Sequence, residues 1–119
     1  MESGKMIDSK IIKDLGKILS VPVYGEKPAT ASGEYVVVEF NKGILNKTLG
    51  NMSIICDSYA DSLYDAASLN REVENALNSL IEKDYISDIS RNSSYPANVT
   101  SLKQYRYKCN FDCNYYEEI

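Results

Sequence analysis

The 119-residue sequence contains no histidine and no tryptophan, and it has only three cysteines and three prolines. Without histidine, Ser-His-Asp and Cys-His catalytic arrangements are impossible, and imidazole ligands for a metal are missing. The sequence also lacks the phosphate-binding patterns G-x-x-x-x-G-K-[ST] and G-x-G-x-x-G. These absences predict a protein that is not an enzyme, with no catalytic residue, no cofactor and no bound metal.

The three cysteines are Cys56, Cys109 and Cys113. Cys109 and Cys113 lie four residues apart in an alternating segment, so a strand separates their Cα atoms by about 13 Å. That distance is too long for a disulfide. Cys56 can reach one of them only if its strand lies alongside. We therefore expect three reduced thiols in the core of a protein from a cytosolic compartment.

Long apolar runs are missing too, and none approaches the ~20 residues of a membrane span. No apolar stretch follows Lys5 as it would in a secretory signal, so no membrane partner is expected. The net charge is −4, and residues 57–88 hold eight acids against Arg71 and Lys83. This acidic band argues against nucleic-acid binding as the main role. A solvated helix face is its simplest explanation.

Apolar residues make up 44% of the sequence and charged residues 25%, which is ordinary for a globular protein. The length predicts a single domain covering residues 1–119. We expect its first residues, 1–5, to be disordered and residues 41–51 to form a flexible loop. That loop carries three apolar residues, Ile44, Leu45 and Leu49. They either cover the core or dock into a neighbouring subunit.

The clearest element is the last one, because residues 102–116 alternate almost without fault. One face would carry Tyr105, Tyr107, Cys109, Phe111, Cys113 and Tyr115, and the other Arg106, Lys108, Asn110, Asp112 and Asn114. Side chains of a strand change face at every residue, so the segment is predicted to be a long, half-buried central strand.

Helical spacing predicts two helices. The first covers residues 6–19, where Ile7, Ile11, Leu15 and Ile18 share a face, and the second runs from Ser62 to about Lys83. Ser62 and Asp65 have the spacing of a capping box. Apolar runs predict strands at 34–40 and 52–59, with a short extended piece at 21–24 and another short strand at 85–90. Residues 91–100, rich in Ser and Asn, are predicted to be a turn-rich connection.

This order predicts an α+β fold: a mixed, mainly antiparallel β-sheet of about four strands, with one long and one shorter helix packed on one face. The acids Asp57, Asp61 and Asp65 are interpreted as residues near a helix N-terminus, where negatively charged carboxylates interact favourably with the helix macrodipole. Tyrosines on the last strand are interpreted as core or interface residues.

The succession of elements resembles the tail-completion, or tail-terminator, proteins of long-tailed phages. A Pro-bearing loop leads into the strand Tyr35–Val38, and a strand ending Ser58-Tyr59-Ala60 precedes a long helix. That helix matches the family pattern Ala-x-x-Leu-x-x-x-Val-x-x-Ala-Leu with Ala66, Leu69, Val73, Ala76 and Leu77. The resemblance covers residues 5–116. One departure is Glu34, where the family often has proline.

The resemblance implies a structural virion protein that forms a hexameric ring, terminates the tail tube and joins it to the head and neck. Its partners would be itself, the tail tube protein and the head-completion protein, with DNA passing through the lumen unbound. It would reside in the neck or tail of the virion, and in the host cytoplasm during assembly. The family's loop between the middle strands reaches across a subunit boundary or toward the lumen, which maps the interface onto Lys42, Ile44, Leu45, Lys47 and Leu49. A possible acidic lumen or outer face would carry Asp57, Asp61, Glu72 and Glu74.

Two alternatives remain open at this point. Another neck component, such as a head-completion or stopper protein, shares the α/β character and the ring habit. A cytosolic homodimeric adaptor or ligand-binding module is the alternative from a different class.

Overall fold

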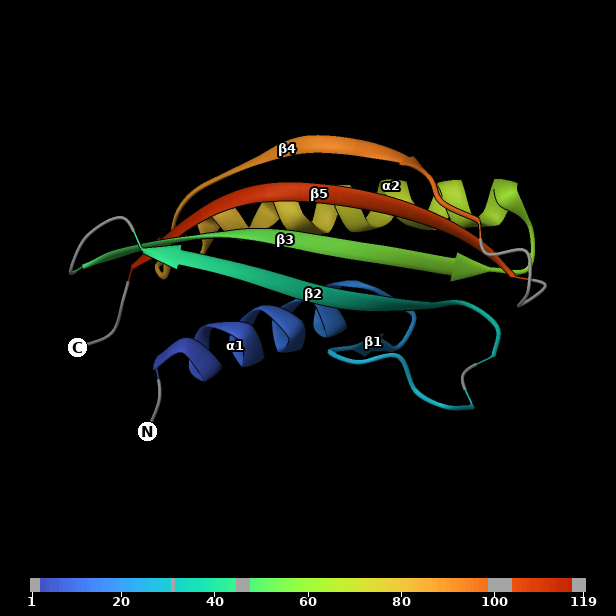
Figure 1. The fold of residues 1–119 in the computed structure, drawn as a ribbon, viewed down its shortest axis with the longest axis horizontal. Coiled ribbons are helices and arrows are strands. Elements are labelled where there is room, and N and C mark those ends of the chain that lie inside the picture. The colour runs from blue at the N-terminus through green and yellow to red at the C-terminus, as the bar shows by residue number, and fades with distance from the viewer. Residues whose placement is uncertain (1–2, 31, 45–47, 99–103, 117–119) are drawn as a thin grey trace.

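The computed structural model describes residues 3–30, 32–44, 48–98 and 104–116, and its elements form a sheet with helices behind it (Figure 1). The elements in chain order are α1 (Ser3–Ile18), β1 (Val23–Tyr24), β2 (Tyr35–Ile44), β3 (Leu49–Ala60), α2 (Leu63–Ser79), the 3-10 turn η1 (Leu80–Glu82), β4 (Ile86–Pro96) and β5 (Tyr105–Tyr116).

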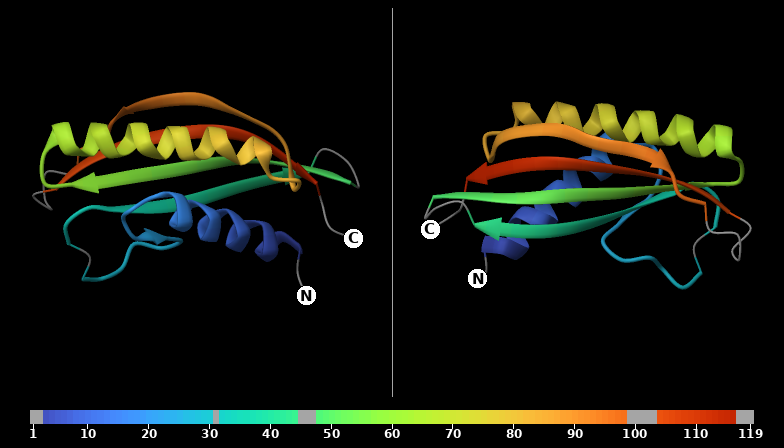
Figure 2. Two further views of the ribbon diagram at one scale, coloured as in Figure 1. Left: turned by 180° about the vertical axis from the view of Figure 1, so that it is seen from behind. Right: turned by 45° about the horizontal axis from the view of Figure 1, so that its top comes forward.

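The sheet has five strands in the order β1-β2-β3-β5-β4. β1 runs parallel to β2, and every other neighbouring pair is antiparallel. Both helices lie on the same face of the sheet (Figure 2). The predicted α+β class, the mainly antiparallel sheet and the helices on one face are therefore confirmed. The sheet has five strands rather than about four, because the extended piece at 21–24 joins it as β1.

The core lies between this face of the sheet and the two helices. Buried side chains include Ile11 and Leu15 of α1, Leu69, Val73 and Leu77 of α2, and Val38, Ile54, Cys56, Cys109 and Phe111 of the sheet. Burying one such aliphatic side chain stabilises the fold by about 1.5–3 kcal/mol. The long helix and the last strand are thus amphipathic in the way the sequence predicts.

The start of α2 shows why that helix begins where it does. The Oγ atom of Ser62 accepts a hydrogen bond from the backbone N–H of Asp65 at 3.1 Å, which satisfies one of the helix's unpaired donors. The helix then continues to Ser79 and tightens into η1 up to Glu82, close to the predicted end at Lys83.

Three boundaries differ from the sequence-based expectation. Residues 41–51 are mostly strand, because the β2–β3 ladder continues through the pairs Asn41↔Ser53 and Gly43↔Asn51. Residues 91–96 belong to β4, an edge strand whose polar Ser and Asn side chains tolerate solvent on one side. α1 already begins at Ser3, inside the segment expected to be disordered.

Tyr105 and Tyr107 also differ from the prediction that the whole alternating face is buried. Tyr105 is 41% exposed and Tyr107 is half-buried, whereas Cys109, Phe111, Cys113 and Tyr115 are buried. Alternation assigns the face of a strand, but burial also requires another layer above that part of the strand.

Candidate interaction surfaces

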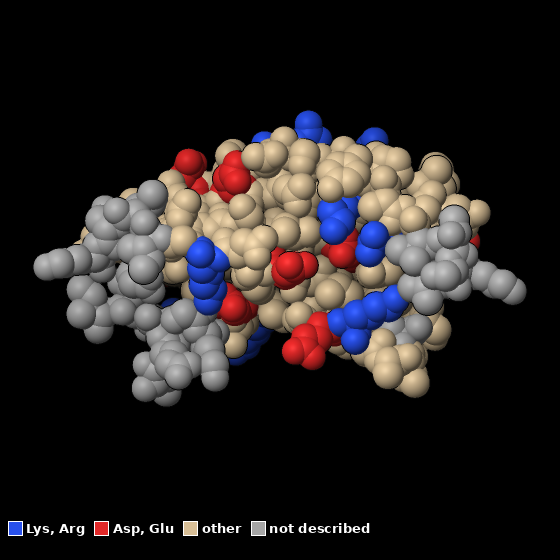
Figure 3. Space-filling view, viewed as in Figure 1, with Lys and Arg blue, Asp and Glu red and all other residues tan. Residues whose placement is uncertain are grey.

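The face of the sheet without helices is turned toward the viewer in Figure 3. Register places Glu39 of β2, Asp57 of β3, and Lys108 and Asp112 of β5 on this face, so both charge signs alternate with uncharged side chains. The picture agrees, because blue and red residues lie interspersed over a mainly uncharged surface.

A row of three side chains crosses one end of this face. Tyr35, Tyr59 and Arg106 are register partners on β2, β3 and β5. The rings of Tyr35 and Tyr59 stack with their centroids 4.6 Å apart and an angle of 11° between their planes. The guanidinium carbon of Arg106 lies 5.9 Å from the centroid of Tyr59. Stacked and cation–π contacts of this kind hold neighbouring strands in register.

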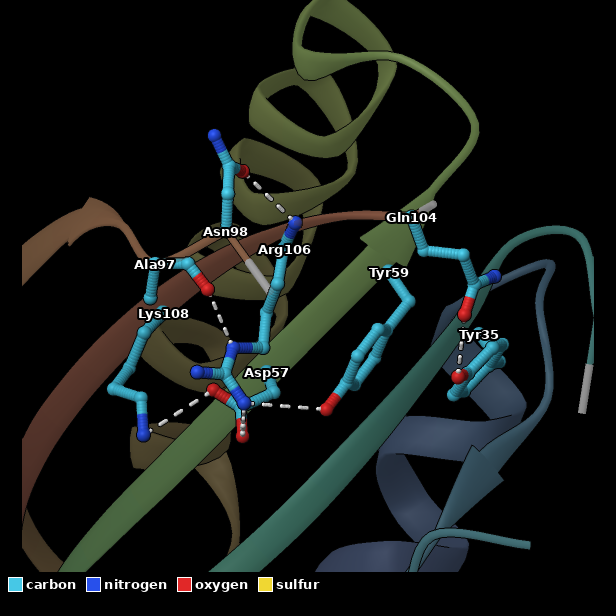
Figure 4. A network of polar contacts seen from close by, with 8 residues as sticks. All are labelled: Tyr35, Asp57, Tyr59, Ala97, Asn98, Gln104, Arg106 and Lys108. Carbon is cyan, nitrogen blue, oxygen red and sulfur yellow. Dashed lines mark hydrogen bonds and ion pairs between the residues drawn. The ribbon is translucent and has the colours of Figure 1, made fainter. Parts of the chain in front are cut away.

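Arg106 is also the centre of a polar network (Figure 4). Its Nε atom donates to the carbonyl oxygen of Ala97 at 2.8 Å, and its Nη1 atom donates to the hydroxyl of Tyr59 at 3.4 Å. The Asp57 carboxylate lies 4.0 Å from Nη1 of Arg106 and 3.5 Å from Nζ of Lys108. Burial lowers the pKa of Arg106, but the Tyr59 hydrogen bond and the Asp57 charge outweigh it, and the net shift is upward. The network fastens the segment after β4 to β5.

Tyr35 is almost fully buried although it lies on the helix-free face, with 1% of its surface exposed. Its hydroxyl donates to Oε1 of Gln104 at 3.1 Å, and the ring of Tyr24 meets it edge-on. Burial raises the pKa of Tyr35, and the neighbouring Tyr59 and Tyr24 raise it further. The phenol therefore stays protonated at neutral pH and acts as a structural hydrogen-bond donor.

The hollows in the surface are shallow. One of about 150 Å³ lies on the outer side of α2, lined by Tyr64, Ala67, Ser68 and Arg71. Another of about 420 Å³ lies beside β2 and is lined by residues of α1, of the turn after β1, and of β2 itself. In the described part of the chain, no group of three or more Cys, Asp or Glu residues could hold a metal ion. No helix among the described residues is long and apolar enough to cross a membrane.

Of the five predicted interface residues, the three that the structure describes lie on the two strands of the β2–β3 hairpin. Lys42 sits on β2, and its Nζ atom lies 2.7 Å from the Asp8 carboxylate of α1. Leu49 opens β3 opposite Tyr116 and is half-buried. Ile44 ends β2, while Leu45 and Lys47 lie outside the described residues. That these five residues form a subunit interface stays a prediction.

The four predicted acids do not share one surface. Asp57 lies on the helix-free face between two cations, and Asp61 is exposed just after β3. Glu72 is exposed on α2. Glu74, on the same helix, contacts Arg91 of β4 at 3.5 Å and the amide of Asn70 at 3.4 Å. A role for any of them in a lumen or on an outer face stays a prediction.

Sequence reasoning placed Arg106 on the outer face of the last strand but missed the network around it. The alternation of residues 105–116 gives the face of Arg106 and nothing about its partners. Those partners, Tyr59 and Ala97, come from distant segments whose pairing depends on the strand order.

No protein family model matches this sequence, and no curated protein matches it. Among solved structures, the chain is similar in fold to a chain from the virion of a native gene transfer agent (GTA) particle. The two share 11% sequence identity and superimpose with a TM-score of 0.60, over 91% of this chain and 90% of the other.

Proposed function

We propose that this chain is a structural subunit of a tailed phage or phage-derived particle. The observation that carries the proposal is the fold likeness to a chain of a gene transfer agent virion, which extends over nine-tenths of both chains. Because the two lengths match so closely, the likeness concerns the whole fold and not a shared sub-motif.

Within such a particle, we assign the chain to the end of the tail tube. There, six copies would form a ring that stops tube growth and joins the tube to the neck. The succession of elements that resembles tail-completion proteins supports this position, and so does the long helix pattern from Ala66 to Leu77. The ring's partners would be further copies of itself, the tube protein and a head-completion protein. Assembly would take place in the host cytoplasm, and the finished protein would reside in the neck or tail.

The charges fit a ring through which DNA passes without being held. The net charge is −4, and exposed acids such as Asp61 and Glu72 would repel phosphates wherever they face a lumen. The cations Arg106 and Lys108 on the helix-free face are already engaged by Asp57. The proposed role therefore needs no specific DNA contact and no cofactor.

Deleting the gene from the particle-producing genome tests the proposal. We expect tail tubes of abnormal, uncontrolled length and heads that lack joined tails, seen by negative-stain electron microscopy. A plasmid copy of the wild-type gene should restore normal particles. Gold-labelled antibody against the chain should mark the junction of head and tail.

Two other outcomes would contradict the assignment. Tails of normal length beside heads that leak DNA would move the chain to a stopper or head-completion position. Normal infectious particles that lack the chain altogether would overturn a virion role and favour the cytosolic adaptor.

A further inference from the structure

The outer side of α2 is turned away from the sheet, and no other element of the described chain covers it (Figure 2). The buried residues of the helix face the core and are Ala66, Leu69, Asn70, Val73, Ala76 and Leu77. The outer side holds the hollow of about 150 Å³ that Tyr64, Ala67, Ser68 and Arg71 line. The fold itself therefore makes no use of this surface.

The hollow has the form of a site that receives a side chain from a neighbouring helix. Its four lining residues are spaced i, i+3, i+4 and i+7, which is how four residues of one helix surround a side chain of another. The small side chains of Ala67 and Ser68 form its floor, so a second helix can approach closely here. Tyr64 and Arg71 form its two ends.

The Arg71 end carries a charge that the chain does not neutralise. Arg71 is exposed, and within the described residues its guanidinium makes no hydrogen bond and no ion pair. Long side chains of a helix lean onto the residues three and four positions earlier, so Arg71 leans over Ser68 and Ala67. By the same rule, Tyr64 leans away from this floor, which leaves the floor open to a group from outside.

An aromatic ring is the group that fits this hollow best. A guanidinium attracts the face of a ring, and the ring also covers the apolar part of the floor. A carboxylate would meet the guanidinium as well, but Asp65 and Glu72 are exposed on the same helix and would repel it. The charges around the hollow thus favour an uncharged aromatic side chain over an acidic one.

The chain itself offers such a ring beside the hollow. Tyr64 is 81% exposed, and the next most exposed large hydrophobic side chain of the described residues is Tyr116 at 53%. Tyr64 and Arg71 lie on one side of α2 and about two turns apart. When two copies of this helix pack in opposite directions, the Tyr64 end of each therefore meets the Arg71 end of the other. The same contact forms twice about a two-fold axis, so the surface is complementary to itself.

We propose that two copies of the chain associate through antiparallel α2 helices, with the Tyr64 ring of each copy in the hollow of the other. There the ring lies on Ala67 and Ser68 and against the Arg71 guanidinium. The contact goes beyond the proposed function and does not rest on it, because an isologous contact is complete with two copies and lies apart from the β2–β3 hairpin. A single helix crossing buries less area than a standard interface, so the pair is weak and forms at high protein concentration.

Sedimentation equilibrium of purified full-length protein, from micromolar to millimolar concentration, tests the contact. Tyr64→Arg sets one guanidinium against another, and Arg71→Glu removes the cation from the hollow. Each variant should raise the dissociation constant of the dimer at least about tenfold. An equimolar mixture of the two should regain dimers like those of wild type. In the mixed pair, the introduced guanidinium meets the introduced carboxylate, and the native Arg71 meets the native Tyr64.

Tyr116→Arg and Lys13→Glu are the matched controls, because they make comparable changes at exposed positions of β5 and α1. They should dimerise like wild type, and all four variants should melt like wild type at micromolar concentration. The contact is overturned if wild type shows no dimer at millimolar concentration, if Tyr64→Arg and Arg71→Glu dimerise like wild type, or if their mixture shows no recovery. Sedimentation distinguishes a dimer from a ring by mass, and the gene-deletion test does not depend on either. The helix contact and the virion role can therefore fail separately.

Discussion

Cys56 of β3 lies directly opposite Cys109 of β5, and neither side chain has any exposed surface. A hydrogen bond between the two thiols, together with burial, holds the pKa of Cys56 well above its ordinary value. The sequence left open whether the strand of Cys56 lies beside that of Cys109, and the sheet order confirms that it does. All three cysteines are unpaired and buried.

Thiol reactivity should follow from this burial. We expect a disulfide exchange reagent such as Ellman's reagent to label none of the three cysteines rapidly in the folded protein at pH 8. In guanidinium chloride, the same titration should count all three. Rapid labelling of even one thiol in the folded state would mean that the helices do not cover the middle of the sheet as they do here.

Alkaline pH should destabilise the fold. Burial and the charge of Asp88 raise the pKa of Cys113 to about 12, whereas a cysteine in the unfolded chain titrates near ~8.5. Between these values the unfolded state holds fewer protons than the folded state, so the unfolding free energy falls as the pH rises. Burial and a hydrogen bond to Asp14 raise the pKa of Tyr85, which acts in the same direction.

Urea unfolding at pH 7.5 and at pH 10 measures this effect. We expect a lower midpoint at pH 10 in wild type and a smaller drop in Cys113→Ala. The slope of the unfolding free energy against pH should differ between the two proteins by no more than about 1.4 kcal/mol per pH unit, which is the limit for one proton. Equal drops in the two proteins would show that Cys113 is not protected from ionisation.

The sequence predicted those elements whose own periodicity is strong. Residues 105–116 alternate apolar with polar side chains, and the helix after Ser62 repeats its apolar positions at helical spacing. β4 was underestimated because its Ser and Asn residues have low strand propensity. It forms anyway, because β5 pairs with it from Ile86 to Pro96, with two irregularities in the register. The length of the β2–β3 hairpin was underestimated for the same reason. Asn41 and Gly43 have low strand propensity, but they extend β2 because they pair with residues of β3.

Long-range contacts were beyond the reach of sequence patterns. Periodicity shows that Arg106 faces away from the helices, but its contact with Tyr59 depends on β3 lying next to β5. The hollow of about 420 Å³ beside β2 likewise requires α1, the turn after β1 and β2 to come together. These arrangements depend on the order of the strands in the sheet. The local sequence pattern does not determine that order, because it is compatible with several of them.

Leu77 should be one of the costliest side chains to truncate. It is fully buried on α2, as its place in the apolar stripe predicts. Leu77→Ala should lower the unfolding free energy by about 2–5 kcal/mol, through lost burial and the cavity that remains. Tyr64→Ala is the control on the same helix, because Tyr64 is 81% exposed and its loss should change stability by less than about 0.5 kcal/mol. Chemical denaturation of both variants compares the two positions, and similar costs would mean that α2 is rotated.

Two glycines of one hairpin should respond differently to alanine. A Cβ atom at Gly50 would meet the ring of Tyr115 closer than van der Waals contact, and Tyr115 is buried. Gly50→Ala should therefore cost about 1–3 kcal/mol, as overpacking does. At Gly43 the Cβ would meet the amide oxygen of Asn51, a half-buried side chain that can rotate away.

Gly43→Ala is accordingly the matched control, and it should cost less than Gly50→Ala in urea unfolding. The double variant Gly50→Ala/Tyr115→Ala should lose less stability than the sum of the two single variants, because removing the ring removes the clash. Strictly additive losses would show that the close approach of Gly50 to Tyr115 is not what restricts this position.

Arg106 should stabilise the fold mainly through its hydrogen bonds and less through its ion pair. Arg106→Met keeps the aliphatic stem near Tyr59 but leaves the carbonyl of Ala97 without its donor, so we expect a loss of about 1.5–3 kcal/mol. The Asp57 carboxylate lies 4.0 Å from Arg106, and it still contacts Lys108 when Arg106 is replaced. The ion pair between Arg106 and Asp57 should therefore contribute under about 1 kcal/mol. Repeating Arg106→Met in an Asp57→Asn background should therefore give nearly the same loss, whereas Lys13→Met, at an exposed position of α1, should change little. If the loss disappears in the Asp57→Asn background, the ion pair and not the Ala97 contact is what holds the segment after β4 against β5.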